Sequence, residues 1–581
     1  MTSLGLGSDL SSGLNPNLNT KLNLDDSRRL TGPNLFGPVT GAIIDVEIIN
    51  FDIDKVISIW KKQIAFLLKS VNWETEKILF RKYKNGASLV ITAPIDVLYA
   101  ATEINEAAWQ LTISEIKQET SNNTNIEDII SHLIKEIEKE EHPKLLALQK
   151  AAIKHNVVFL SDDDEVSLGY GASCKIYPVN AIPDPENIDW DSIEDIPVGL
   201  ITGTNGKSTT VRLASAVVAA AGKRCGITST DYIRVGEKIL DKGDYSGPGG
   251  ARTLLRHPET EVAFLEVARG GMLRRGIGIN HAKTALITNV SEDHLGEYGI
   301  NNLDDMVEAK FIVRHAINNH QNLILNADDD GCINFAKQLD NTIVWFSWSK
   351  SNKIIQSQID NKKPACYVEN EIIYYTEKGI EQEIIHVNNI PITLNGAAKH
   401  NVHNALGVVA LSFSLGIKVK DIRSGLKQFT STPEDNPGRG NLFKINGFKV
   451  ILDFAHNEQG LSLMAETVNN MPAKRRLVLL CQAGDRTDEL IKGLVKSALK
   501  ANPDVLVICE LEDYLRGRKL GEMPKLIHKY AIELGMQEEQ LLHAKNTIEG
   551  TRVALDWAEN NDLILLLALD HRDEVIGILK S

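Results

Sequence analysis

A glycine-rich segment in the middle of the chain carries the residues best suited to chemistry. Residues 199–210 read GLITGTNGKSTT, so a short apolar run precedes a glycine-rich turn, and an alanine-rich helical window follows. Strand, loop and helix in this order are typical of a phosphate-binding loop, and a chance glycine-rich turn is the weaker alternative. Lys207 would reach the outer phosphates and the Ser208 hydroxyl would bind Mg²⁺. Ile201 stands where the general motif has its first glycine. The predicted nucleotide-binding residues of this loop are Gly203, Thr204, Asn205, Gly206, Lys207, Ser208 and Thr209.

Three further side chains could serve a phosphate-transfer site. Glu266 follows the apolar run 262–265, and a carboxylate at the carboxyl end of a parallel strand points into the ligand crevice. The alternative for Glu266 is a helix cap. His294 could be a metal ligand or a structural histidine. Lys310 lies in a predicted helix, 303–317, where a lysine is ordinarily a solvated charge.

Ordered motifs along the chain resemble those of the Mur ligase superfamily. After TGTNGKSTT at 202–210, they are VAFLE at 262–266, TNVSEDH at 288–294, EAK at 308–310, NADD at 326–329, HNVHN at 400–404, PGR at 437–439 and DFAHN at 453–457. Shorter segments resemble the C-terminal half of the cyanophycin synthetase branch. They are GDYSGP at 243–248, EVARGGMLR at 266–274, GDR at 484–486 and EDYLRGR at 512–518.

The resemblance implies an ATP-dependent ligase that activates a carboxylate as an acyl phosphate and joins it to an amine. It implies ATP and Mg²⁺ as cofactors, a carbamylated Lys310, and catalytic roles for Lys207, Glu266, His294 and Lys310. The implied Mg²⁺ ligands are Ser208, Glu266, His294 and Lys310. The implied adenine, phosphate and ribose contacts beyond the loop are Asn401, Asn404, Arg439 and Asp453.

The substrate residues follow from the same resemblance. Arginine forks grip carboxylates, so a carboxylate acceptor, a small molecule or a peptide, would bind Ser246, Arg269 and Arg274. The incoming amino acid, for which a basic side chain would suit the acidic residues, would bind His456, Asp485, Arg486, Glu512 and Arg516. For each of these charges the alternative is a surface ion pair of little energetic value.

Alternating strand-like and helical runs predict an α/β protein of three domains. We expect a tail at 1–33, an N-terminal α+β domain at 34–190, a central P-loop Mur-ligase ATPase domain at 191–437 and a C-terminal Rossmann-like domain at 438–581. A proline-rich, acidic segment at 181–197 predicts a linker. The cyanophycin enzymes have an ATP-grasp domain before their Mur-like half, but only about thirty residues separate Gly171 from the phosphate loop here. We therefore expect that domain to be absent.

Composition narrows the class of partner. The net charge of -14 would repel nucleic acid, and the apolar run 563–569 is too short to span a bilayer. Six cysteines without a C-x-x-C pair favour a reducing cytoplasm. The sequence leaves open the oligomeric state, a homo-oligomer included, and the acceptor. A peptidoglycan or folate-like carboxylate, or a nucleotide-binding scaffold without chemistry, are the alternatives.

Overall fold

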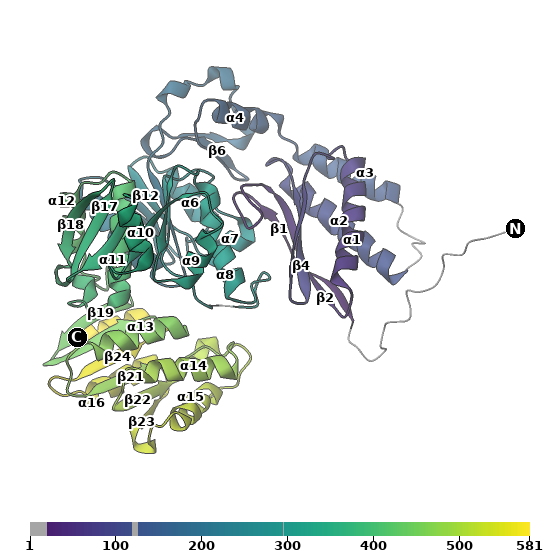
Figure 1. Cartoon of the computed structure of the whole chain (residues 1–581). Helices are drawn as coiled ribbons and strands as arrows, with labels where there is room; N and C mark the ends of the chain where they lie inside the picture. The colour runs from purple at the N-terminus through teal and green to yellow at the C-terminus, as the bar shows by residue number, and fades with distance from the viewer. Residues whose placement is uncertain (1–19, 119–125, 294) are drawn as a thin grey trace.

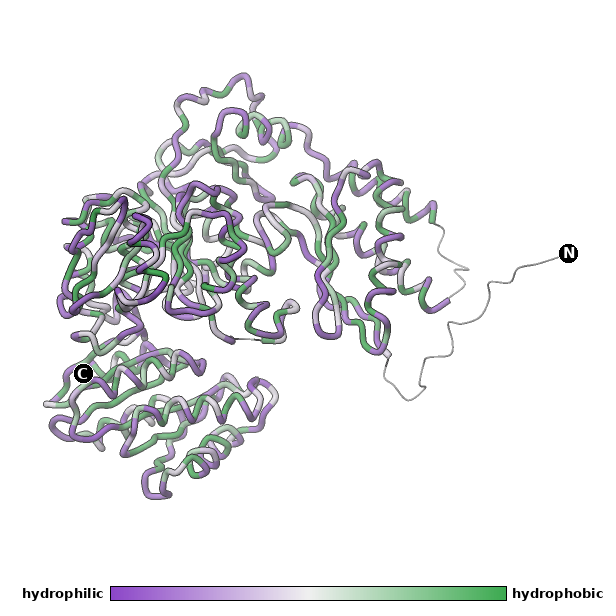
Figure 2. The backbone as a smooth tube through the Cα atoms, in the orientation of Figure 1, coloured by the Kyte–Doolittle hydropathy of each residue, from purple (hydrophilic) through white to green (hydrophobic). Residues whose placement is uncertain are grey.

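The computed structural model describes residues 20–118, 126–293 and 295–581 (Figure 1). An N-terminal part lies beside a large central sheet, and a smaller sheet near the C-terminus lies below it. Hydrophobic segments run through the middle of each part in Figure 2. No helix among the described residues is both long and apolar enough to cross a membrane.

The N-terminal part is an antiparallel sheet with three helices. The sheet order is β1-β2-β4-β3, and Trp60 and Trp109 are fully buried between the sheet and the helices. The strands are β1 (Lys21–Leu30), β2 (Gly41–Ile49), β3 (Ile78–Tyr83) and β4 (Gly86–Thr92), and the helices are α1 (Ile53–Ser70), α2 (Leu98–Lys117) and α3 (Ile126–Glu140).

The expected tail at 1–33 is wrong over its second half. Strand β1 pairs with β2 along its whole length, and Leu30 is 1% exposed. Leu22 and Leu24 pack at intermediate burial against the helical core. The alternation of apolar and polar residues in this segment is weak, because β1 is an edge strand whose outer residues remain solvated. The sequence therefore lacked a clear period. The rest of the predicted tail, 1–19, lies outside the described residues.

Along the chain, a small second unit lies between this sheet and the central one. Its three-stranded sheet packs against α4 through a core of its own that includes Leu148 and Leu168. The predicted linker 181–197 contains short 3-10 turns whose Ile182 and Ile193 are buried in the same core. The elements are α4 (Pro143–Lys154), β5 (Phe159–Ser161), β6 (Glu165–Leu168), η1 (Gly171–Ser173), β7 (Lys175–Pro178), η2 (Val179–Ala181), η3 (Pro185–Asn187) and η4 (Trp190–Ser192).

The central sheet has eleven strands in the order β11-β10-β9-β12-β8-β13-β14-β15-β16-β17-β18. Its seven middle strands, from β9 to β16, run parallel, and antiparallel pairs close both edges. The middle strands are nearly continuous apolar runs because helices cover both faces. The strands are β8 (Val198–Thr202), β9 (Cys225–Thr228), β10 (Tyr232–Val235), β11 (Lys238–Lys242), β12 (Val262–Glu266), β13 (Thr284–Ile287), β14 (Asn322–Asn326), β15 (Thr342–Ser347), β16 (Ala365–Glu369), β17 (Ile372–Glu377) and β18 (Ile380–His386).

Helices divide between the two faces of this sheet. One face carries α5 (Lys207–Ala220), α11 (Lys399–Ser414) and α12 (Val419–Gln428). The other carries α6 (Pro248–Leu255), α7 (Arg269–Arg275), α8 (Leu303–Lys310), α9 (Asp330–Ala336) and α10 (Lys353–Asp360). Short 3-10 turns are η5 (Phe311–Ala316), η6 (Val387–Asn389) and η7 (Pro391–Thr393). Helix α8 therefore ends at Lys310, before the predicted end of the helical window.

The last part is a six-stranded sheet in the order β19-β20-β24-β21-β22-β23, parallel except for β19. The helices α13 (Glu458–Asn469), α14 (Asp488–Leu499) and α15 (Glu522–Glu533) cover one face, and α16 (Thr547–Trp557) and α17 (Arg572–Lys580) cover the other. The strands are β19 (Arg439–Ile445), β20 (Phe448–Asp453), β21 (Arg476–Leu480), β22 (Val505–Cys509), β23 (Leu541–Ala544) and β24 (Leu563–Leu567), with turns η8 (Glu512–Tyr514) and η9 (Glu538–Gln540). The predicted α/β class is confirmed.

The N-terminal sheet is joined to the central part by specific polar contacts. The Thr31 amide donates to the Arg275 carbonyl at 2.9 Å, just after β1 and at the end of α7. From β3, Arg81 forms an ion pair with Asp305 and donates its Nε to Glu308 at 3.2 Å, both on α8. The N-terminal part is thus connected to the helix that ends at Lys310.

Candidate active site

The phosphate loop joins the end of β8 to the start of α5 and requires its glycines. Gly203 has a φ of +146°, and a Cβ there would lie 2.0 Å from Thr288 Oγ1. Gly206 has a φ of +85°, and a Cβ there would lie 2.4 Å from Asn404 Oδ1. Both positions are in a region of φ that side chains disfavour, and both lack room for one. The loop is therefore a backbone cradle without side chains at these two positions, of the kind that binds anions such as phosphate.

The turn that follows β13 fixes the shape of the loop. The Thr204 amide donates to the Asn289 carbonyl at 2.9 Å, and the Asn205 amide donates to Asn289 Oδ1 at 3.0 Å. Thr288 Oγ1 in turn donates to the Asn205 carbonyl at 2.7 Å. The TNVSEDH and TGTNGKSTT motifs therefore form one unit, although 84 positions separate Asn205 from Asn289.

A buried carboxylate faces the first turn of α5. Ser208 Oγ donates to Glu266 Oε1 at 3.1 Å, and Glu266 is 2% exposed. Burial raises the pKa of Glu266, and the nearby Lys207 opposes that shift. The N-cap of α7 is Ala268, so Glu266 does not cap this helix and the capping alternative is excluded.

Lys207 turns back over the loop. Its Nζ donates to the Thr204 carbonyl at 2.9 Å. Burial lowers its pKa, and attraction to Glu266 and Asp293 opposes that shift. A cation held here by one carbonyl can exchange that bond for a phosphate oxygen.

Glu266 and Ser208 fit a divalent cation. Among the described residues, the second carboxylate oxygen, Glu266 Oε2, is buried without a hydrogen-bond partner, and such an oxygen beside a hydroxyl is a hard-ligand pair of the kind Mg²⁺ prefers. Within the same residues no three His, Cys, Asp or Glu side chains gather as a complete metal site. His294, the histidine that was expected as a ligand, lies outside the described residues.

Lys310 is not a solvated surface lysine. It is the last residue of α8 and is 3% exposed. Burial holds its pKa well below the usual value, and repulsion from Lys207 lowers it further. A lowered pKa favours the neutral amine, which is the form that can react with carbon dioxide.

A cavity of about 290 Å³ lies between the phosphate loop and the C-terminal sheet. It brings together residues of four predicted motifs: Asn205, Gly206, Thr209, Asn401, Asn404, Arg439, Asp453 and His456. On α11, Asn404 Nδ2 donates to Asn401 Oδ1 at 3.1 Å, so the two asparagines share one helix face as the spacing predicted.

Two titratable residues of this cavity, Asp453 and His456, have shifted pKa values. Burial raises the pKa of Asp453 to about 6, and Arg439 opposes the shift. Burial lowers the pKa of His456 to about 4. Among the described residues, the Nε of Arg439 is buried without a hydrogen-bond partner. That donor could serve a phosphate without breaking an existing bond.

Three further contacts join the domains across the cavity. Asn205 Nδ2 donates to Gln459 Oε1 at 2.7 Å, and Asn457 Nδ2 donates to Asn205 Oδ1 at 3.2 Å. Ser291 Oγ also donates to Gln459 Oε1, at 2.8 Å. Ser291 and Asn457 are letters of the TNVSEDH and DFAHN motifs without a predicted role, and no local signal singled out Gln459.

The three predicted acceptor residues already have partners, and one of them lies beside Glu266. Ser246 lines the same small cavity as Glu266, and its Oγ donates to Asp244 at 2.6 Å. Arg269 forms an ion pair with Glu297 at 2.5 Å. The last of the three is Arg274, whose Nε donates to the Tyr298 hydroxyl at 3.2 Å.

The predicted amino-acid residues of the C-terminal part form a separate group. Arg516 pairs with Asp485 at 2.5 Å, and both are exposed by more than a third, as in the surface-pair alternative. Arg486 and Glu512 lie in the same region, after β21 and β22. None of these four lines the cavity described above, whereas His456 does.

These features define an α/β P-loop protein with a second α/β domain beside the loop. The Mur ligase middle domain model matches residues 201–412, and the Mur ligase glutamate ligase domain model matches residues 438–568. The chain belongs to the Mur ligase family.

Its similarity extends to the cyanophycin synthetases. It is 36% identical to that of Crocosphaera subtropica over 337 residues, which is 58% of this chain and 38% of the relative. It is 31% identical to that of Nostoc over 374 residues, 64% of this chain and 41% of the relative. The chain thus spans about two fifths of the length of these relatives.

A peptidoglycan enzyme covers more of the chain at lower identity. The UDP-N-acetylmuramoyl-L-alanyl-D-glutamate–2,6-diaminopimelate ligase of Clostridium botulinum is 26% identical over 72% of this chain and 82% of its own length. Among solved structures, E. coli FolC in complex with ADP aligns at 16% identity, with a TM-score of 0.48, over 66% of this chain and 89% of its own.

Proposed function

We propose that this chain is an ATP-dependent ligase that joins a carboxylate to the amine of an amino acid. The observation that carries the proposal is the grouping of Lys207, Ser208 and Glu266 at the backbone cradle of the phosphate loop. This group lies beside the cavity lined by Arg439 and Asp453. Family membership over both matched domains supports it.

In the proposed reaction, ATP supplies the γ-phosphate, whose charge a bound Mg²⁺ would help to neutralise. An oxygen of the acceptor carboxylate attacks the γ-phosphorus, and ADP leaves. The amine nitrogen then attacks the acyl carbon, the carbon–oxygen bond to phosphate breaks, and the amine loses a proton. Backbone amides of the loop and Lys207 position the phosphates, and Ser208 with Glu266 would hold the cation.

Closure of the C-terminal domain would exclude water from the acyl phosphate. The contacts from Asn205 to Asn457 and Gln459 suit this task, because they tie the loop to the domain that delivers the amine. Lys310, once carbamylated, would supply a second anion near the cation.

We further propose that the product is one amino acid added to an existing carboxylate. Between β7, the last strand of the small sheet, and β8, which leads into the phosphate loop, the chain has only the 3-10 turns η2, η3 and η4. That segment leaves no room for a second ligase domain. Arg269 and Arg274 favour an acidic acceptor such as an aspartyl peptide, provided that substrate replaces their present partners. Asp485 and Glu512 would suit a basic incoming amino acid.

The test is ADP release across a panel of amino acids, each offered with acidic peptides, a peptidoglycan precursor and a folate. We expect release that depends on the acceptor, with a mass gain of one amino acid per carboxylate. Lys207→Ala should reduce turnover by roughly 100-fold or more without loss of folding. Polymer made from free aspartate and arginine would contradict the single-addition proposal. Tight ATP binding without turnover on any acceptor would contradict the ligase proposal and favour a scaffold.

A further inference from the structure

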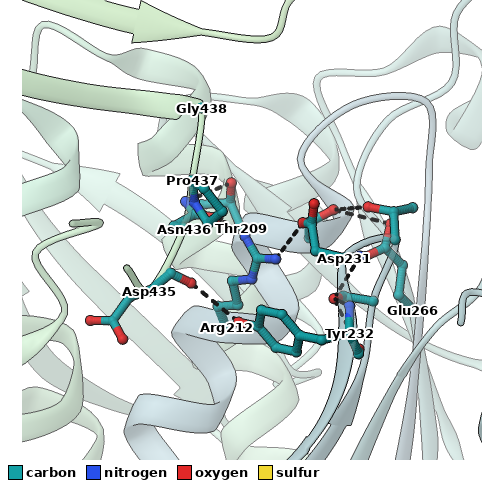
Figure 3. A network of polar contacts seen from close by, with 12 residues as sticks. Thr209, Arg212, Asp231, Tyr232, Glu266, Asp435, Asn436, Pro437 and Gly438 are labelled. Atoms are coloured by element: carbon teal, nitrogen blue, oxygen red, sulfur yellow. Dashed lines mark hydrogen bonds and ion pairs between the residues drawn. The ribbon is translucent and has the colours of Figure 1, made fainter. Parts of the chain in front are cut away.

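A buried arginine on the phosphate-loop helix connects the two ligase domains (Figure 3). The Arg212 side chain is 0% exposed. It donates to Asn436 Oδ1 and to Asp231 Oδ2, each at 2.5 Å, and its guanidinium lies 4.9 Å from the centre of the Tyr232 ring. A buried charge needs such partners, because leaving one unpaired is strongly unfavourable.

Asp231 is shared between the central and C-terminal domains. Its Oδ2 accepts from Arg212, and its Oδ1 accepts from Arg572 at 3.0 Å. Arg572 is the first residue of α17 in the C-terminal sheet domain. The two guanidinium groups therefore bind different oxygens of the same carboxylate. Arg572 and Asp231 are 341 positions apart in the sequence.

The shared carboxylate lies next to the cation and phosphate site. Thr230, its neighbour in sequence, places Oγ1 3.4 Å from Ser208 Oγ, and Ser208 donates to Glu266. Asp231 lies in the turn between β9 and β10, and Glu266 is the last residue of β12, which pairs with β9. Figure 3 shows both side chains beside helix α5. A shift of Asp231 would therefore move Thr230, which contacts the predicted Mg²⁺ ligand Ser208.

The segment that joins the domains is held on the same helix. Asn436 Nδ2 donates to Thr209 Oγ1 at 3.4 Å and to Ser431 Oγ at 2.8 Å. The Pro437 carbonyl also accepts from Arg572, at 3.5 Å. Helix α5, the joining segment and α17 are thus tied together where the chain passes from one domain to the other.

The charges favour this arrangement over an accidental contact. Burial alone would raise the pKa of Asp231, but attraction from Arg212, Arg439 and Arg572 outweighs it and lowers the pKa. Arg439 is also the arginine predicted to contact phosphate. One carboxylate therefore pairs with two arginines and is attracted by a third, Arg439, which lines the nucleotide cavity.

We propose that Asp231 is a positioning residue which, by holding Arg212 and Arg572 at once, sets the C-terminal domain against the phosphate loop in the arrangement that the ligase step requires. The inference deepens the proposed function and rests on it. Arg572 contacts no reacting atom in this proposal. Its loss should lower turnover through domain placement and leave nucleotide binding by the loop largely intact.

The primary variant is Arg572→Gln, because this side chain is 28% exposed and its loss leaves Arg212 paired. The matched control is Arg552→Gln, which changes an exposed arginine of α16 in the same domain. We expect Arg572→Gln to lower kcat about tenfold and to change the Kd for ATP less than about threefold, while Arg552→Gln keeps wild-type values. Combined with Asp231→Asn, Arg572→Gln should add little to the loss from Asp231→Asn alone.

A second measurement does not depend on ligase activity. Limited proteolysis of the joining segment, residues 429–438, should be faster in Arg572→Gln than in wild type and Arg552→Gln, with and without ADP. Unchanged kcat and unchanged proteolysis in Arg572→Gln would overturn the proposal, and so would additive losses in the double variant. If wild type releases no ADP with any acceptor, the ligase proposal fails, yet the proteolysis comparison still decides whether Arg572 holds the domain.

Discussion

At the scale of single residues, burial determines which protonation states the site can use. Lys310 is the clearest case, because a lysine that is 3% exposed beside Lys207 cannot easily carry its usual charge. The helical pattern around it would fit a solvated lysine equally well. Its chemistry is therefore a property of the folded site.

Lys310→Ala should reduce ligase turnover by roughly 100-fold, because the predicted carbamate would be lost from the cation site. Acetate, formate or chloride should restore part of the activity by occupying the vacated space as an anion. Carbon-13 NMR after incubation with labelled bicarbonate should show a carbamate in wild type only. Full activity in Lys310→Ala would return this residue to a structural role.

Asp453 gives a prediction about pH. The folded protein binds this proton more tightly than the unfolded chain, since burial raises the pKa from 3.8 to about 6. Ionisation of the buried group therefore costs stability above pH 6, and this cost disappears as pH falls toward 4. Without nucleotide, Asp453→Asn should melt a few degrees higher than wild type at pH 8 and no higher at pH 4. An equal gain at both values of pH would disprove the titration argument.

At the scale of elements, the strand β8, the loop and helix α5 work as one unit with the turn after β13. The unit depends on backbone conformation as much as on side chains, as Gly203 and Gly206 show. Two glycines of similar φ lie at the two ends of α5. They allow the effect of backbone strain to be separated from the effect of a steric clash.

Gly206→Ala should abolish detectable ATP binding, since a Cβ would lie 2.4 Å from Asn404 Oδ1 at a φ of +85°. Gly222→Ala is the matched control, because its φ is +77° and nothing lies within 4 Å of a Cβ there. Both variants should lose about 1–2 kcal/mol of stability from the left-handed conformation, but only Gly206→Ala should lose the nucleotide. Calorimetric titration with ATP and thermal melts measure the two effects; equal ATP affinity in both variants would show that the close contact is harmless.

At the scale of the whole molecule, the N-terminal sheet contacts helix α8, which ends at Lys310. Arg81 on β3 binds Asp305, Glu308 and the Gly299 carbonyl, and α8 ends at Lys310. The N-terminal part therefore supports the orientation of this helix as well as any role that it has in binding the acceptor.

Arg81→Ala should lower kcat about threefold to tenfold, because α8 would lose two polar contacts that fix its orientation and the turn before it would lose a third. Lys82→Ala is the control, since the neighbouring Lys82 is exposed and pairs with Asp54 inside the N-terminal part. Its kcat should stay at the wild-type value. The proposal for α8 fails if the two variants have the same kcat.

The sequence alone determined much of this protein. The buried strands at 198–202, 284–287 and 322–326 were predictable, because helices on both faces demand continuous apolar runs. The phosphate loop was also predictable, because its glycines and its Lys–Ser pair are contiguous. Ordered motifs were sufficient to indicate the family.

Only the tertiary structure decided which charges are buried and which segments meet. Strand β1 escaped prediction because its pairing with β2, and not its own pattern, makes it a strand. The contact of Asp231 with Arg572 joins residues 341 positions apart, and neither has a local signal. Periodicity reports the face on which a residue lies, whereas the partner on that face depends on the packing of distant elements. For the same reason, the burial of Lys310 became visible only when α8 was packed against its neighbours.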